Sequence, residues 1–233
     1  MRFFVIPAWL LLLPLGTTSY ISKVNGAPGD RDSDSYTPLI RAVRKNNFDL
    51  VKRLLDNGAD AKATSDAGYT ALMFAAKFGT EKMLKLLLPM SNAKAINKYG
   101  TTALMFAAYY GNDKSVELLL PKSDAKATDN RGNTALMFAA RDGTAKMVEL
   151  LLPKSDAKAT NNNGRSALMF ASRFGKDKSV ELLLPESDAK AISNRGETAL
   201  DIAKATLEYY YRALDIAKSR GYNKIVELLQ QHN

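Results

Sequence analysis

The side chains that most enzymes use for catalysis are almost absent from this chain. It has no cysteine and one histidine, His232, at the second-to-last position. A thiolate nucleophile, a disulfide framework, a zinc site of cysteines and histidines, and a Ser-His-Asp relay are therefore excluded. Aspartate and glutamate could act alone as acid and base, but no paired-carboxylate motif stands out. The sequence predicts a protein that is not an enzyme and that binds no metal or cofactor.

The remaining chemistry is that of charge. The net charge is +9 and the pI is near 9.5, values that are compatible with a nucleic-acid or acidic partner. Five lysines, spaced 32 residues apart, each follow an Asp or Asn by two positions: Lys62, Lys94, Lys126, Lys158 and Lys190. In extended chain such neighbours share a face. Opposite charges three apart would pair on a helix: Lys114 with Glu117, Lys146 with Glu149, and Lys178 with Glu181. These patterns predict a self-compensated surface.

The elements that would position binding residues come from one heptad that returns at a fixed spacing. TALMFAA begins at residues 70, 102 and 134, and variants of it begin at 166 and 198, each start 32 after the one before. A weaker copy, TPLIRAV, begins at residue 37. A fixed period in this range indicates stacked units that bury a continuous core between neighbours.

One unit shows how the sequence specifies local structure. The turn Asn-Lys-Tyr-Gly ends at Gly100, which can take a positive φ. Thr102 then caps a short helix over residues 103–110, and Gly111 breaks it. A second helix follows, and Pro121 stops it because proline cannot continue the hydrogen-bond ladder. Repetition of this pattern predicts an all-α solenoid of about six helix-turn-helix units with short hairpin turns, spanning residues 36–233.

At these residues the chain resembles the ankyrin-repeat family. In the first unit, TPL at 37–39 stands where the family has TPLH, and VKRLLDNGAD at 51–60 is similar to the family's VVxLLLxxGAD run. The likeness covers about residues 36–231. It departs at Met73 and its counterparts, which replace the family's histidine, and in later units LLLPKSDA lacks a glycine and one residue. The resemblance implies a concave binding face formed by the hairpin tips and the first helix of each unit.

Positions that differ between otherwise constant units are the candidates for binding. The recurring phenylalanines, Phe74, Phe106, Phe138 and Phe170, are interpreted as interior packing rather than as a platform for bases. The resemblance places the variable positions on the concave face, and tyrosine and arginine are enriched in interface hot spots. For any single position, unselected surface remains the alternative. The predicted partner-binding residues are Lys77, Phe78, Lys98, Tyr99, Tyr109, Tyr110, Asn130, Arg131, Arg141, Arg173, Phe174, Asn194 and Arg195.

Residues 1–26 have the features of a secretory signal peptide. An almost wholly apolar run, residues 3–15, is followed by small polar residues. The run is shorter than the about 20 apolar residues that a membrane span needs, so we expect no transmembrane anchor. Cleavage is predicted after Gly26, with Ser19 as the alternative; a buried start to the first repeat is the competing interpretation. Residues 27–35 are predicted to be a flexible leader.

The last unit, which starts near residue 198, contains a 14-residue insertion. TALDIA at its start is echoed by RALDIA 14 residues later. Because 14 residues make nearly four helical turns, both apolar patches would lie on one side of a continuous helix. We therefore expect one helix over residues 199–219, ended by Gly221, and a final helix over residues 224–230.

Taken together, these features predict an exported scaffold, secreted or periplasmic, that binds a partner protein through its concave face. We expect it to be a monomer. The alternative is a basic surface for nucleic acid or anionic membrane, whose binding would fall steeply with added salt.

Overall fold

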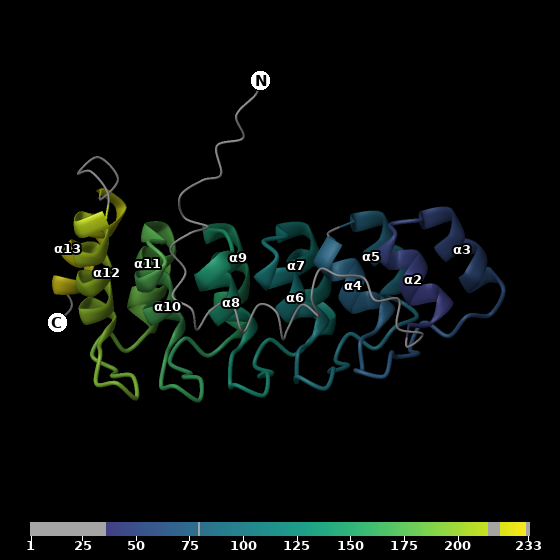
Figure 1. Ribbon diagram of the computed structural model, residues 1–233, viewed down its shortest axis with the longest axis horizontal. Helices are drawn as coiled ribbons and strands as arrows, with labels where there is room; N and C mark the ends of the chain where they lie inside the picture. Colours follow the sequence, from purple (N-terminus) through teal and green to yellow (C-terminus); the bar gives the residue numbers. More distant parts are fainter. Residues whose placement is uncertain (1–35, 79, 214–219, 232–233) are drawn as a thin grey trace, which may run out of the picture. The chain divides into compact units, whose positions relative to one another are not determined.

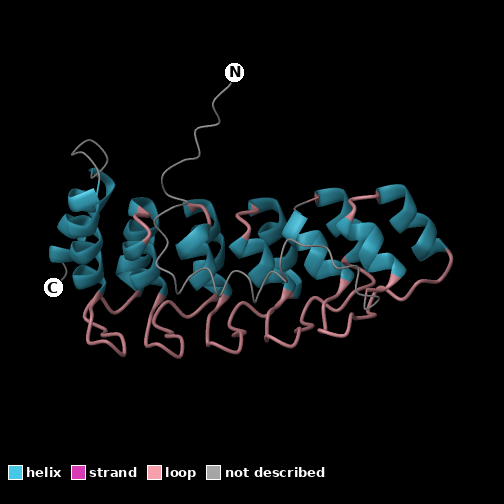
Figure 2. Cartoon of the chain, viewed as in Figure 1, coloured by secondary structure: helices cyan, strands magenta, loops and turns pink. Residues whose placement is uncertain are grey.

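The computed structural model describes residues 36–78, 80–213 and 220–231. Within these ranges twelve α-helices form six pairs, and β-structure is confined to isolated bridges at the turns, such as Thr64 with Thr70. Figures 1 and 2 show the pairs side by side, with the turns along one edge. The predicted all-α array of helix pairs is confirmed. The predicted signal peptide and leader lie outside the described residues.

Each pair consists of a helix that begins within the heptad and a second helix that packs against it. The first helices are α2 (Pro38–Arg44), α4 (Ala71–Phe78), α6 (Ala103–Tyr109), α8 (Ala135–Asp142), α10 (Ala167–Arg173) and α12 (Ala199–Ala213). The second helices are α3 (Phe48–Asp56), α5 (Glu81–Leu87), α7 (Asp113–Leu119), α9 (Ala145–Leu151), α11 (Asp177–Leu183) and α13 (Arg220–Gln230). Single 3₁₀ turns extend three of these: η2 (Leu120–Lys122), η3 (Leu152–Lys154) and η4 (Leu184–Glu186).

The residue that opens each heptad starts the first helix. The Thr102 hydroxyl accepts a hydrogen bond from the Met105 backbone N–H at 3.2 Å, as predicted for an N-cap. The α-helix ends within one residue of the predicted end. α7 stops at Leu119, and Pro121 lies inside the 3₁₀ turn that follows. Proline is tolerated there because the first residues of a helical turn have no acceptor for their N–H groups.

The constant residues of the heptad form the core. Leu104 and Leu136 are fully buried, and Met137 is 2% exposed. The expectation of interior packing is confirmed for three of the four phenylalanines, Phe74, Phe106 and Phe138, whereas Phe170 is only half-buried. First helices pack on the first helices of adjacent units, and second helices on second helices.

The turns are tied together by buried polar side chains. Asn161 Oδ1 accepts hydrogen bonds from the backbone N–H groups of Asn163 and Arg165, both at 3.0 Å. Its Nδ2 donates to Asn133 Oδ1 of the preceding turn at 2.8 Å. The equivalent position is always Ser, Asn or Asp and always buried: Ser65, Asn97, Asp129, Asn161 and Ser193. These side chains supply the hydrogen-bond partners that the backbone groups of a buried turn cannot obtain from water.

The end of the array corrects one expectation. α12 is helical as far as Ala213, and the rest of the predicted helix, residues 214–219, lies outside the described residues. Gly221 does not end a helix but lies in the first turn of α13, which starts earlier than predicted. Glycine disfavours helix through the backbone entropy it loses, at a cost of about 1 kcal/mol, but it keeps its N–H and does not prevent a helix from forming. Among the described residues, no helix is long and apolar enough to cross a membrane.

Candidate protein-binding surface

Rings and cations from the ends of successive first helices meet in a continuous row. The Tyr109 and Tyr110 ring centroids are 4.9 Å apart, edge to face. Arg141 lies 5.6 Å from the Tyr109 ring and 5.5 Å from the Phe174 ring. On the other side, the Lys77 ammonium is 4.9 Å from the Tyr110 ring. Cation–π and edge-to-face contacts therefore link residues of four units.

A second set of rings rises from the turns to join this row. The Tyr69 ring lies 6.4 Å from Tyr99 and 5.5 Å from Phe74, and Phe74 in turn stacks on Phe78 at 6.4 Å. We call the combined surface the aromatic band: Tyr69, Lys77, Phe78, Tyr99, Tyr109, Tyr110, Arg141 and Phe174. Seven of these eight are predicted binding residues, which the structure thus brings together. The eighth, Tyr69, follows a turn glycine at one of the positions that vary between units, which the resemblance places on the concave face.

The band continues into the first unit through residues that the sequence did not single out. Tyr36 meets Phe74 edge to face at 5.6 Å, and the Arg44 guanidinium lies 4.5 Å from the Tyr36 ring. Tyr36 holds the position just before the first heptad, which in the later units is held by Tyr69, Thr101, Asn133, Arg165 and Glu197. Comparison between repeats marks this position as variable, but Tyr36 is not among the predicted binding residues.

Burial shifts the pKa of four groups in the band. Burial, reinforced by Tyr99 and Tyr36, raises the pKa of Tyr69 to about 12. Burial also raises the pKa of Tyr109 and of Tyr110, and it lowers the pKa of Lys77 together with the charge of Arg44. Phe78 and Tyr99 remain 44% and 41% exposed. The band thus presents apolar ring surface with polar hydroxyls and cations, a composition typical of interface hot spots.

One carboxylate interrupts the row of rings. Asp142 occupies the position held by Phe78, Tyr110 and Phe174 in other units. Its Oδ2 lies 3.2 Å from the Arg141 Nε, yet neither atom has a hydrogen bond of good geometry among the described residues. Burial raises the pKa of Asp142 to about 6, against the attraction of Arg141 and Lys176. Asp142 was not among the predicted binding residues.

The predicted residues on the hairpin tips are divided between structure and surface. Asn130 Nδ2 donates to the Lys98 carbonyl at 2.9 Å, and Asn194 Nδ2 donates to the carbonyl of the preceding turn at the same distance. These amides join neighbouring turns. Lys98, Arg131 and Arg195 are exposed, and Arg173, at the end of α10, is half-buried.

The five lysines that are spaced 32 residues apart do not have the predicted extended geometry. Asp60 Oδ1 accepts a hydrogen bond from the backbone N–H of Lys62 at 2.8 Å, and the other four Asp or Asn residues do the same two positions on. The chain therefore turns at these points instead of running extended. The Asp or Asn side chain closes a local turn, as these residues commonly do.

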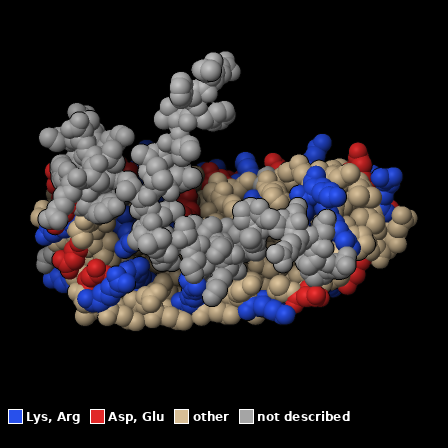
Figure 3. Space-filling view, viewed as in Figure 1, with Lys and Arg blue, Asp and Glu red and all other residues tan. Residues whose placement is uncertain are grey.

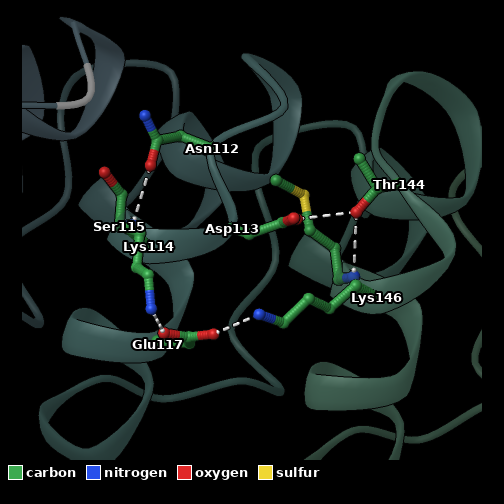
Figure 4. Close-up of polar contacts among 8 residues, drawn as sticks. Asn112, Asp113, Lys114, Ser115, Glu117, Thr144 and Lys146 are labelled. Atoms are coloured by element: carbon green, nitrogen blue, oxygen red, sulfur yellow. Dashed lines mark hydrogen bonds and ion pairs between the residues drawn. The ribbon is translucent and has the colours of Figure 1, made fainter.

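The second helices carry ion pairs that run between units. Glu117 pairs with Lys114 at 2.9 Å, as predicted, and also with Lys146 of the next unit at 2.7 Å (Figure 4). Lys146 thus reaches Glu117 rather than Glu149. Similarly, Glu181 pairs with Lys224 of α13 at 2.5 Å. Hydrogen bonds from both lysines lower the pKa of Glu117 to about 2.

This arrangement leaves the outer surface of mixed charge. Figure 3 shows acidic and basic side chains interspersed over the uncovered parts of the face it draws. Within the described ranges, no group of three or more His, Asp or Glu side chains is placed to hold a metal ion. The aromatic band is therefore the surface of these residues best suited to binding.

Comparisons with known proteins agree with this architecture. The family described as ankyrin repeats (3 copies) matches residues 39–129 and 105–195. A similar solved structure is that of the Bd0816 predatory endopeptidase from Bdellovibrio bacteriovorus in complex with the immunity protein Bd3460. One chain of that structure is 28% identical in sequence to this chain, with a TM-score of 0.68, and the match covers 85% of this chain and 100% of the other. The chain is thus a protein-interaction scaffold by architecture. Its period, capped helix pairs and stacked turns are those of the matched repeats, and the chain belongs to the ankyrin-repeat family.

Proposed function

We propose that the chain is an exported, non-catalytic scaffold that binds a partner protein through the aromatic band. The observation that carries this proposal is the convergence of variable positions from four constant units into one surface of rings and cations. The similar structure, in which an immunity protein is bound to an endopeptidase, supports an endopeptidase as the first partner class to test.

The binding face is tested by affinity capture with the full chain as bait. A Phe78→Ala, Tyr99→Ala variant removes the two most exposed rings of the band. We expect this variant to capture about one-tenth or less of the partner that the original chain captures from the periplasmic or extracellular fraction of the native organism. Truncation of aromatic hot-spot residues commonly lowers affinity by this much. Peptidase activity of the same fraction, measured with and without the chain, identifies the partner class.

The matched control removes similar apolar area elsewhere. Ile96 and Ile192 are 61% and 63% exposed and lie outside the band. An Ile96→Ala, Ile192→Ala variant should capture the partner as well as the original chain does. Equal retention by all three baits would show that the partner uses another surface.

Export is tested on the protein recovered from its native cells. We expect it in a periplasmic or extracellular fraction, with an N-terminus at residue 27 by Edman sequencing. Recovery of the full chain from the cytoplasm with residues 1–26 intact would contradict the proposed signal peptide.

A further inference from the structure

Two variable positions in the turns carry aromatic residues at one end of the array and arginines at the other. Tyr69 and Tyr99, whose rings lie 6.4 Å apart, have counterparts three repeats later in Arg165 and Arg195. The turns at both places are joined by the same hydrogen bond, from Lys98 N to the residue-67 carbonyl at 2.9 Å and from residue 194 N to the residue-163 carbonyl at 3.0 Å. A ring pair in the second and third units is thus replaced by an arginine pair in the fifth and sixth.

A third arginine joins this pair. Arg173 ends α10, whose first turn follows Arg165 directly. Arg165 is half-buried, and its pKa is lowered by burial and by the charges of Arg173 and Arg195, with Glu197 opposing them. Figure 3 shows Lys and Arg side chains over the turns at the α10–α12 end, with acidic side chains beside them. We call Arg165, Arg173 and Arg195 the arginine cluster. Crowded like charges of this kind attract an incoming anion.

Guanidinium groups bind carboxylates through two parallel hydrogen bonds, which makes them selective for acidic side chains. The cluster adjoins the aromatic band, since Phe174 follows Arg173 and lies beneath Arg141. We propose that the arginine cluster binds carboxylates of an acidic segment on the partner protein, while the aromatic band packs against apolar side chains of the same segment. This inference rests on the proposed function and specifies the chemistry of the partner.

Nucleic acid fits this surface less well. Single-stranded nucleic acid needs open ring faces for its bases and cations that follow its backbone. The Tyr109 and Tyr110 rings meet edge to face, and Arg141 and Lys77 lie over them. The clustered arginines occupy one end of the row only.

The test measures binding of the full chain to a fluorescein-labelled peptide of alternating glutamate and phenylalanine, by fluorescence anisotropy. An Arg165→Gln, Arg195→Gln variant is compared with Lys158→Gln, Lys190→Gln. Both variants lose two positive charges from the same part of the array, and both lysines are exposed. We expect the arginine variant to bind about tenfold or more weakly, and the lysine variant to change by less than about twofold. Circular dichroism melts establish that each variant is folded, and Arg195→Gln alone, at an exposed position, provides a second measurement.

Three outcomes would overturn the inference: equal weakening by both variants, unchanged binding by the arginine variant, or tighter binding of single-stranded DNA that depends on the same arginines. The captured partner separates this inference from the proposed function. A partner lost by the Phe78→Ala, Tyr99→Ala bait but kept by the arginine variant leaves the scaffold function standing and rejects the acidic segment. A partner kept by both baits rejects the proposed function itself.

Discussion

At the scale of single residues, the partly buried carboxylate of Asp142, next to the aromatic band, lowers the stability of the folded protein at neutral pH. Its side chain is 28% exposed and lies in a row otherwise occupied by rings. Burial raises its pKa to about 6, above its ordinary value of 3.8. Because the folded state binds this proton more tightly than the unfolded chain does, the contribution of Asp142 to stability is largest below pH 3.8 and falls as pH rises through 6.

Replacing Asp142 by asparagine should therefore stabilise the protein at neutral pH. We expect Asp142→Asn to raise the free energy of unfolding at pH 7 by about 1–2 kcal/mol and to flatten its pH dependence between pH 4 and 6.5. Urea unfolding across this range measures both effects. Glu149→Gln, which changes an exposed carboxylate of the same unit, should leave stability nearly unchanged. A less stable Asp142→Asn protein at pH 7 would mean that the contact with Arg141 outweighs the cost of burial.

At the scale of elements, a glycine substitution can test how closely neighbouring turns stack. Gly132 and Gly196 occupy the same turn position, with φ of 76° and 74°. A Cβ on Gly132 would stand 2.7 Å from Asn162 Oδ1 and 3.0 Å from Asn162 N, whereas a Cβ on Gly196 would meet nothing within 4 Å, because no described turn follows it. Both sites share the left-handed backbone, and only one has a neighbour.

We expect Gly196→Ala to cost about 1 kcal/mol, the penalty for a side chain in the left-handed region. Gly132→Ala should cost about 2–4 kcal/mol, because it adds a clash with the next turn. Chemical denaturation of the two variants gives the difference directly. Equal losses would show that the turns do not stack this closely in solution.

At the scale of the described array, stability arises between neighbours. First helices pack on the second helix of their own unit and on the first helices of adjacent units, so the free energy of folding is close to a sum of local and nearest-neighbour contributions. A central unit therefore supports two interfaces and the first unit supports one. This predicts different consequences for the same core truncation at different places.

Leu136→Ala, in α8, should lower the stability of the whole array by about 2–5 kcal/mol. Leu39→Ala, in α2, should instead release mainly the first unit. Native-state hydrogen exchange would then show lost protection over residues 38–56 with the central units still protected. Both leucines are buried, at 0% and 2% exposure, so burial alone does not distinguish them. Uniform loss of protection in the Leu39 variant would contradict the nearest-neighbour picture.

The sequence by itself was sufficient for everything that repeats locally. The period, the Thr102 cap, the buried leucines and the variable ring and arginine positions follow from hydrogen bonding and burial within one unit, which recur wherever the heptad recurs. The same local rules were less secure where elements end. Gly221 reads as a helix stop in the sequence, but it lies in the first turn of α13.

Only the tertiary structure decided which residues of different units meet. It pairs Glu117 with Lys146, places Arg141 over both Tyr109 and Phe174, and leaves the Asp142 carboxylate partly buried beside Arg141. These contacts depend on how far each unit is shifted and rotated relative to the next. That geometry results from the packing of helices and turns against their neighbours, and spacing along the chain does not contain it.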